Sequence, residues 1–136
     1  MNQLMAVLRS APIRLTVAIS WSLLLSVLLL QAEADPVIDL GIPQGENTLA
    51  RELAFSTLHL LAFGGTCICW FWALPRKWRP RTNLIAACLI TIALGIATEF
   101  MQTFTPDRHA SWIDLVANIS GTVLAARLIW THQETR

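Results

Sequence analysis

The chain has 136 residues, of which 54% are hydrophobic and only 14% are charged, and its formal net charge is +1. An ordinary soluble domain carries about 25% charged residues, so this composition excludes that class and favours a membrane protein. The sequence has no basic tail and no basic patch interleaved with aromatic residues, so no nucleic acid partner is expected.

Four apolar runs follow one another along the chain, at residues 15–30, 53–72, 84–101 and 112–130. Each run can cross about 30 Å of hydrocarbon as a helix with help from its flanks. A single long loop, at residues 31–52, is expected outside the membrane, and little room remains for a separate soluble domain. The sequence therefore predicts an all-α polytopic fold in which residues 1–136 form a single integral membrane domain of four transmembrane helices.

The first run follows Arg9 and Arg14 and precedes an Ala-x-Ala sequence at residues 32–34. These features are also typical of a secretory signal peptide, in which case residues 1–34 could be cleaved. The apolar stretch is at or beyond the long end for a signal peptide, so we favour an uncleaved membrane span.

The charges of the loops alternate along the chain. Residues 31–52 are mainly acidic, whereas the loop after the second run is basic, with Arg76, Lys77, Arg79 and Arg81. Basic residues concentrate in the cytoplasmic loops of membrane proteins. This alternation predicts that both termini lie in the cytoplasm.

Polar residues gather near those ends of the last three runs that this topology places at the outer surface. They are His59, Glu99, Arg108, Asp114 and Asn118. Ionisable side chains are costly in hydrocarbon, so several at one depth indicate a binding or catalytic site.

Each of these residues also has a structural interpretation. His59 could be an interhelical hydrogen-bonding residue, and Arg108 could anchor the chain to lipid phosphates. Asp114 could complement a helix dipole behind an N-cap at Ser111. A carboxylate such as Glu99 in a membrane segment needs a partner or a proton, and we therefore favour a site for the group as a whole.

The segment 99–121 resembles the signature of VanZ-like membrane proteins, which in outline reads E-x-x-Q, P-x-R and S-x-x-D-x-x-x-N-x-x-G. The matching residues are Glu99, Gln102, Pro106, Arg108, Ser111, Asp114, Asn118 and Gly121. A histidine on the second helix followed by a phenylalanine is also typical of that family, and His59 and Phe63 match it. The chain departs from the family pattern at Phe55 and Ser56, where an Asp-Lys pair is often found.

The resemblance implies a small, multi-pass protein of the bacterial inner (cytoplasmic) membrane with about four helices. The family is named for an association with resistance to the glycopeptide antibiotic teicoplanin. A link between this chain and glycopeptide resistance is therefore an expectation that comes from the resemblance alone.

The first functional hypothesis is recognition of a cell-envelope lipid or a lipid-linked precursor at the outer leaflet. Arg108 would bind phosphate through its two-pronged guanidinium, and membrane lipids would be the partners. The residues expected to bind the ligand are Gln102, Arg108, Ser111 and Asn118.

The second hypothesis is an enzyme that acts on a phosphorylated, lipid-linked substrate. The candidate catalytic residues are His59, Glu99 and Asp114: His59 would be the general acid or base, and a carboxylate would orient it. These side chains could hold a divalent metal, but the sequence has no metal-binding motif, so no metal site is predicted.

The third hypothesis is a structural or assembly partner, in which the polar cluster only locks the helices together. The sequence leaves open whether there is catalysis, which ligand and cofactor bind, and the oligomeric state.

Overall fold

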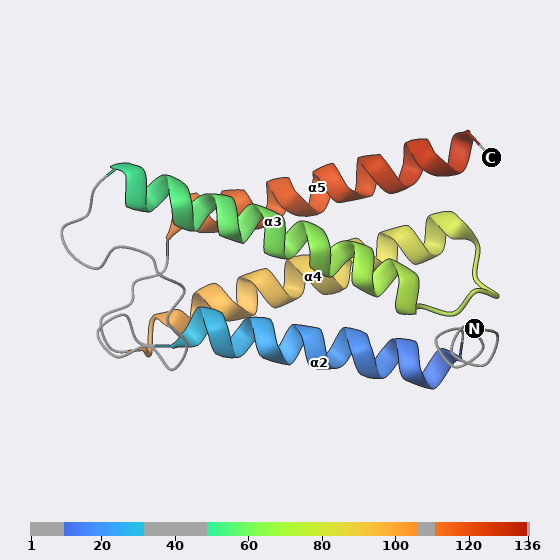
Figure 1. Ribbon diagram of the computed structural model, residues 1–136, viewed down its shortest axis with the longest axis horizontal. Helices are drawn as coiled ribbons and strands as arrows, with labels where there is room; N and C mark the ends of the chain where they lie inside the picture. Colours follow the sequence, from blue (N-terminus) through green and yellow to red (C-terminus); the bar gives the residue numbers. More distant parts are fainter. Residues whose placement is uncertain (1–9, 32–48, 106–110, 136) are drawn as a thin grey trace, which may run out of the picture.

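Four helices make up most of the chain in the computed structural model, which describes residues 10–31, 49–105 and 111–135 (Figure 1). They are α2 (Ala11–Leu30), α3 (Leu49–Ala73), α4 (Pro80–Gln102) and α5 (Trp112–Glu134). Each is long and apolar enough to cross a membrane, and the described ranges contain no strand. The predicted all-α fold with four such helices is confirmed.

The helices alternate in direction, so each end of the bundle gathers two helix starts and two helix ends (Figure 1). At one end, called the cluster end because His59, Glu99, Asp114 and Asn118 contact one another there, α2 and α4 end and α3 and α5 begin. At the hairpin end, α2 begins, α5 ends, and residues 74–79 join α3 to α4. The first described helix therefore begins at the end where the last one finishes. The cytoplasmic location of that end stays a prediction from the loop charges.

The starts of the helices follow from local sequence. Proline lies in the first turn of α2 (Pro12) and of α4 (Pro80), where a missing backbone N–H costs nothing. Ser111 caps α5, because its Oγ accepts a hydrogen bond from the backbone N–H of Asp114 at 3.4 Å. The N-cap that the sequence predicts at Ser111 is present.

The closest packing in the bundle joins α3 to α5 through two glycines. A Cβ atom added to Gly121 would clash with the carbonyl oxygen of Leu60. One added to Gly64 would lie 3.2 Å from the carbonyl oxygen of Gly121. Membrane helices associate through such small residues because their backbones can then touch. This contact sets how closely α3 and α5 approach at the centre of the bundle.

The distribution of polarity differs from that in a soluble protein, because many polar side chains are buried while large apolar ones are exposed. Buried polar side chains line the interior, among them Thr66, Thr91 and Thr122, each at most 1% exposed. Large apolar side chains point outward, as Leu61 and Leu128 do at 63% and 66% exposure. An apolar exterior of this kind suits contact with lipid tails and would promote aggregation in water.

Hydrogen bonds from long side chains attach α2 to α3. The Trp21 indole donates to the Thr66 hydroxyl at 2.9 Å, and the Trp70 indole donates to Ser22 at 3.0 Å. Arg14 is buried, donates to the carbonyl oxygen of Trp72 at 2.7 Å and lies over its ring. The sequence indicated Arg14 only as a flanking charge, and the structure gives it a packing role as well.

Candidate functional site

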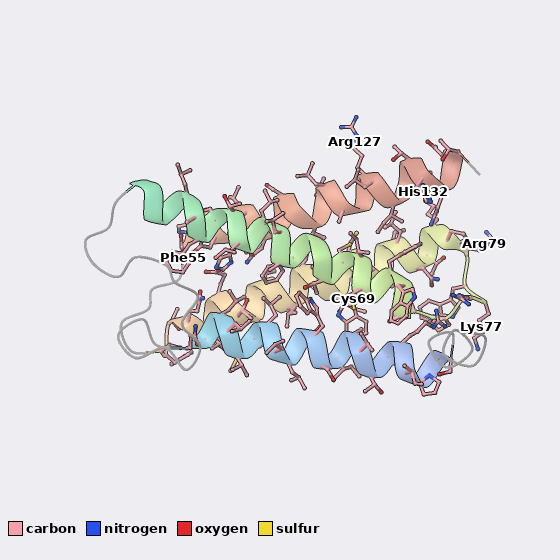
Figure 2. The ribbon with its side chains drawn as sticks, in the orientation of Figure 1. Phe55, Cys69, Lys77, Arg79, Arg127 and His132 are labelled. Atoms are coloured by element: carbon pink, nitrogen blue, oxygen red, sulfur yellow. The ribbon has the colours of Figure 1, made fainter. Side chains whose placement is uncertain are left out.

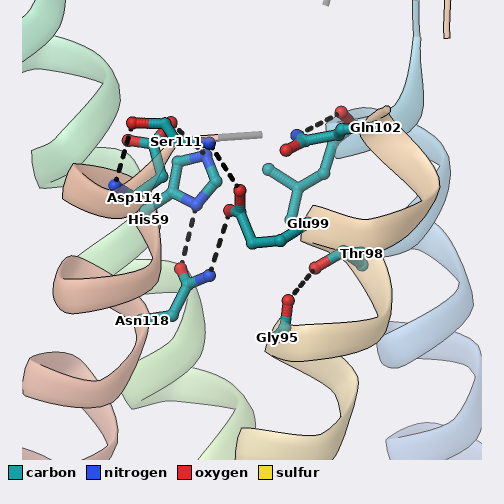
Figure 3. A network of polar contacts seen from close by, with 9 residues as sticks. His59, Gly95, Thr98, Glu99, Gln102, Ser111, Asp114 and Asn118 are labelled. Atoms are coloured by element: carbon teal, nitrogen blue, oxygen red, sulfur yellow. Dashed lines mark hydrogen bonds and ion pairs between the residues drawn. The ribbon is translucent and has the colours of Figure 1, made fainter. Parts of the chain in front are cut away.

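The polar cluster at the cluster end takes one or more side chains from each of α3, α4 and α5 (Figure 3). Its members in the described part of the chain are His59, Glu99, Ser111, Asp114 and Asn118. These residues are as far apart as positions 59 and 118, yet they form one connected network.

Glu99 connects α4 to the start of α5 with both of its carboxylate oxygens. Oε2 accepts a hydrogen bond from the Ser111 backbone N–H at 3.0 Å, and Oε1 accepts one from the Asn118 side-chain amide at 3.5 Å. The side chain is 6% exposed. A buried carboxylate needs such partners, and the start of a helix is favourable for negative charge. The sequence indicated that Glu99 needs a partner or a proton, and the partners in the structure are hydrogen-bond donors at the start of α5.

His59 lies at the centre of the cluster and is 1% exposed. Its Nδ1 lies 2.9 Å from Oδ1 of Asn118, and its ring stacks on Phe63, one turn along α3. Its Nε2 is buried and has no hydrogen-bond partner among the described residues. The nearest acidic oxygen is Oδ2 of Asp114, 4.0 Å from Nε2, which is too far for a hydrogen bond.

The network determines which nitrogen of His59 carries the proton. In its carboxylate form Glu99 can only accept, so Asn118 turns its NH₂ group to Glu99 and its carbonyl oxygen to His59. That carbonyl oxygen also only accepts, so Nδ1 of His59 must be the donor. In the neutral imidazole, Nε2 is then an acceptor, and it faces a second acceptor on Asp114.

Asp114 and Ser111 are the partly exposed members of the cluster, and Asp114 is the one whose carboxylate faces His59. Its side chain is 19% exposed, whereas His59 behind it is 1% exposed. Because Asp114 lies in the first turn of α5, the helix dipole favours its negative charge. The cluster is thus a buried imidazole behind a partly exposed carboxylate.

The other predicted ligand-binding residues have different surroundings. Gln102 is buried, but its side-chain amide donates to the carbonyl oxygen of Leu29 at 3.0 Å, which joins α4 to the end of α2. Ser111 takes part through its backbone N–H and its capping hydroxyl. Arg108 lies outside the described residues.

Two contributions to the cluster do not follow from residue types. The Ser111 backbone N–H that binds Glu99 carries no sequence signal. Gly95 allows Phe63 and Asn118 to approach α4, because a Cβ there would lie 3.1 Å from Phe63 and 3.5 Å from Asn118. Its place one turn before Glu99 was the available signal, since glycine in a helix interior usually has a packing or functional reason.

Among the described residues, no three His, Cys, Asp or Glu side chains are grouped so that they could hold a metal ion. The arrangement instead offers hydrogen-bond acceptors close to a helix start.

A family model described as VanZ/LLP1 matches residues 6–133, which is nearly the whole chain. This match confirms the resemblance drawn from the segment 99–121 and from His59. No curated protein and no solved structure matches the chain.

Proposed function

We propose that this chain, which belongs to the VanZ/LLP1 family, recognises the polar head group of a cell-envelope lipid or lipid-linked intermediate. The observation that carries the proposal is Nε2 of His59, a buried polar atom without a hydrogen-bond partner in the described part of the chain. It lies behind the partly exposed Asp114, so a ligand group that reached Asp114 would meet it. A buried polar atom without a partner costs free energy, and a ligand can supply the missing partner.

The depth of the cluster supports a lipid as the ligand. Because α3 and α5 begin at this end and each is long enough to cross a membrane, the cluster in this proposal lies near the membrane surface, just beneath the lipid head groups. Large aromatic side chains at the same end are exposed, with Phe104 at 74% and Trp112 at 82%. Aromatic residues of this kind are typical of the membrane interface.

Arg108 extends the proposal to the phosphate of such a lipid. In the sequence it lies between Gln102 and Ser111, which end α4 and cap α5. A guanidinium binds phosphate with two parallel hydrogen bonds. In this proposal the lipid belongs to the outer leaflet of the bacterial inner membrane, and any role in glycopeptide resistance acts through that lipid.

Catalysis on the same head group is the second candidate, and the geometry of His59 favours it. Asn118 holds Nδ1, which leaves Nε2 as the basic nitrogen, and a general base needs this arrangement. We place recognition first because it needs only the acceptors that the cluster presents, whereas catalysis needs a reacting group positioned beside Nε2 as well.

The test is the set of lipids that co-purify with the full chain from native membranes, identified by mass spectrometry. His59→Leu removes the imidazole and should lose a specific lipid class that the wild type retains. Thr91→Val is the matched control, because it also removes a buried polar atom that has no hydrogen-bond partner among the described residues. Thr91 lies about two turns from Glu99 along α4, away from the cluster. The control should keep the wild-type lipid profile.

Equal lipid retention by His59→Leu, Thr91→Val and the wild type would count decisively against head-group recognition. If His59→Leu then also melted at a lower temperature, the cluster would act only as a lock between helices. Loss of turnover on the retained lipid, with its binding intact, would instead favour the enzyme.

A further inference from the structure

We infer that the gap between Nε2 of His59 and Oδ2 of Asp114 receives an ammonium group with at least two N–H bonds, carried by the lipid head group. The inference rests on the proposed function and narrows its ligand to a chemical class. It follows from three properties of the cluster: its acceptors, its width and its charge.

The first property is that two acceptors face each other. Asn118 accepts from Nδ1 of His59, so Nε2 of the neutral ring is an acceptor, and Asp114 presents a carboxylate oxygen to it. Two acceptors repel each other unless a donor lies between them. A head group that brings a donor would therefore be favoured here.

The second property is the width of the gap. The two atoms are 4.0 Å apart, so they do not form a direct hydrogen bond even when the ring is protonated. A single atom between them can lie about 2.9 Å from both, within the usual range for a hydrogen bond. Such an atom must carry at least two N–H or O–H bonds. Among the donors that lipid head groups carry, an ammonium group has three such bonds, whereas an alcohol hydroxyl has one.

The third property is charge. Glu99 and Asp114 are both acidic, and the described part of the cluster supplies no lysine or arginine against them. A cation with N–H donors would offset this negative charge as well as satisfy the acceptors, which a neutral hydroxylated head group would not do. An ammonium group therefore fits better than a sugar or glycerol hydroxyl.

The experiment titrates the detergent-purified full chain with phospholipids of identical acyl chains and measures the bound fraction by native mass spectrometry. The series is phosphatidylethanolamine, its monomethyl and dimethyl forms, and phosphatidylcholine, and it removes N–H donors one at a time while the positive charge and phosphate stay. We expect the drop in affinity to fall between the monomethyl form, which has two N–H bonds, and the dimethyl form, which has one. Its size should be about tenfold, as for one charge-assisted hydrogen bond.

Asp114→Asn is the matched variant, because it keeps the shape of the side chain and removes its charge. It should abolish the difference along the methylation series, and Thr91→Val should leave that difference unchanged. The series on the wild type stands by itself if Asp114→Asn fails to fold.

Equal binding of phosphatidylethanolamine and phosphatidylcholine overturns the ammonium inference, and so does stronger binding of phosphatidylglycerol, whose donors are hydroxyls. The proposed function fails separately: in that case His59→Leu and the wild type bind every lipid of the series equally. If His59→Leu weakens binding of all lipids alike, head-group recognition stands and the ammonium inference falls.

Discussion

The two ends of the bundle both bury polar side chains, but they satisfy them differently. At the hairpin end, Arg14 and Asn83 donate to backbone carbonyl oxygens, those of Trp72 and Pro75. At the cluster end, Gln102 also donates to a backbone carbonyl oxygen, that of Leu29, but His59, Asn118 and Glu99 are joined mainly through side chains. A helix or turn fixes the position of a backbone carbonyl, whereas a side-chain partner can exchange with a ligand. Burial of polar atoms therefore does not by itself identify a site.

Unpaired atoms remain at both ends, so the contrast depends on what faces them. Nε of Arg14 and Oδ1 of Asn83 have no partner in the described ranges, but another atom of each side chain binds the backbone. Nε2 of His59 faces a second acceptor across a gap. At the hairpin end, the unpaired atoms belong to side chains that are already held by a hydrogen bond to the backbone. At the cluster end, two acceptors face each other, and a donor between them would satisfy both.

The largest expected loss of stability comes from a substitution between the two ends, at the contact of α3 with α5, and it should disturb the packing at both ends. Gly121→Ala places a Cβ against the carbonyl oxygen of Leu60, so α3 and α5 must separate. We expect a loss of about 3 kcal/mol of stability, at the upper end for overpacking, measured by thermal unfolding in detergent. Gly65→Ala is the control, because nothing lies within 4 Å of its Cβ position, and it should not destabilise the fold. A stable Gly121→Ala protein would show that the contact is not obligatory.

The next largest effect should distinguish the hairpin end from the cluster end, because stability should fall while lipid binding stays unchanged. Arg14→Ala removes the hydrogen bond to Trp72 and the packing of the guanidinium on its ring. A buried, charged hydrogen bond of this kind contributes about 2 kcal/mol, so the melting temperature should fall. The co-purifying lipids should stay as in the wild type. A change in lipid class on Arg14→Ala would contradict the distinction drawn between a structural end and a binding end.

A smaller effect on stability, with a specific signature, is expected for Glu99→Gln. The new amide would keep its carbonyl oxygen on the Ser111 backbone N–H and turn its NH₂ to Asn118, so Asn118 is favoured to turn its carbonyl oxygen to position 99 and its NH₂ to His59. The proton of His59 would then move from Nδ1 to Nε2, which ¹⁵N chemical shifts of the labelled ring report. Stability should fall by about 1 kcal/mol. An unchanged tautomer would show that Glu99 does not act through Asn118.

The smallest effect on stability should come from Arg108→Ala, with at most about 0.5 kcal/mol lost, because the sequence places Arg108 in the loop between two spans. Retention of the native lipid should nevertheless fall severalfold, because the proposed phosphate contact is removed. Arg127→Ala is the matched control, since Arg127 is exposed and points away from the bundle (Figure 2). If both variants retain lipid equally, the phosphate contact is excluded.

The sequence predicted the helices well because their signal is additive. A run of apolar residues such as 84–101 indicates a membrane helix wherever its neighbours lie, and α4 contains it within Pro80–Gln102. The juxtaposition of His59 with Asp114 was also predictable in outline, because alternating helices bring such residues to one depth. The ends of the helices were less predictable, since α3 and α5 continue past their apolar runs through polar residues.

The finer geometry depends on how closely helices approach and how each is rotated about its axis. Residue type predicted Gln102 as a ligand-binding residue, but the rotation of α4 turns it to Leu29 on α2. The backbone N–H of Ser111 is common to almost every residue, so no pattern could indicate that Glu99 would bind it. The orientation of the bundle and the identity of the lipid stay predictions.

The glycine contact between α3 and α5 has a mechanical consequence. Where two backbones touch, the helices cannot move closer, and the motion left to them is a change of crossing angle about that point. His59 is about 7.5 Å along the α3 axis from Gly64, so a tilt of about 10° would shift the ring by roughly 1 Å. The two helices would therefore rotate about this contact, and the distance between the His59 imidazole and the Asp114 carboxylate would change with the crossing angle of α3 and α5.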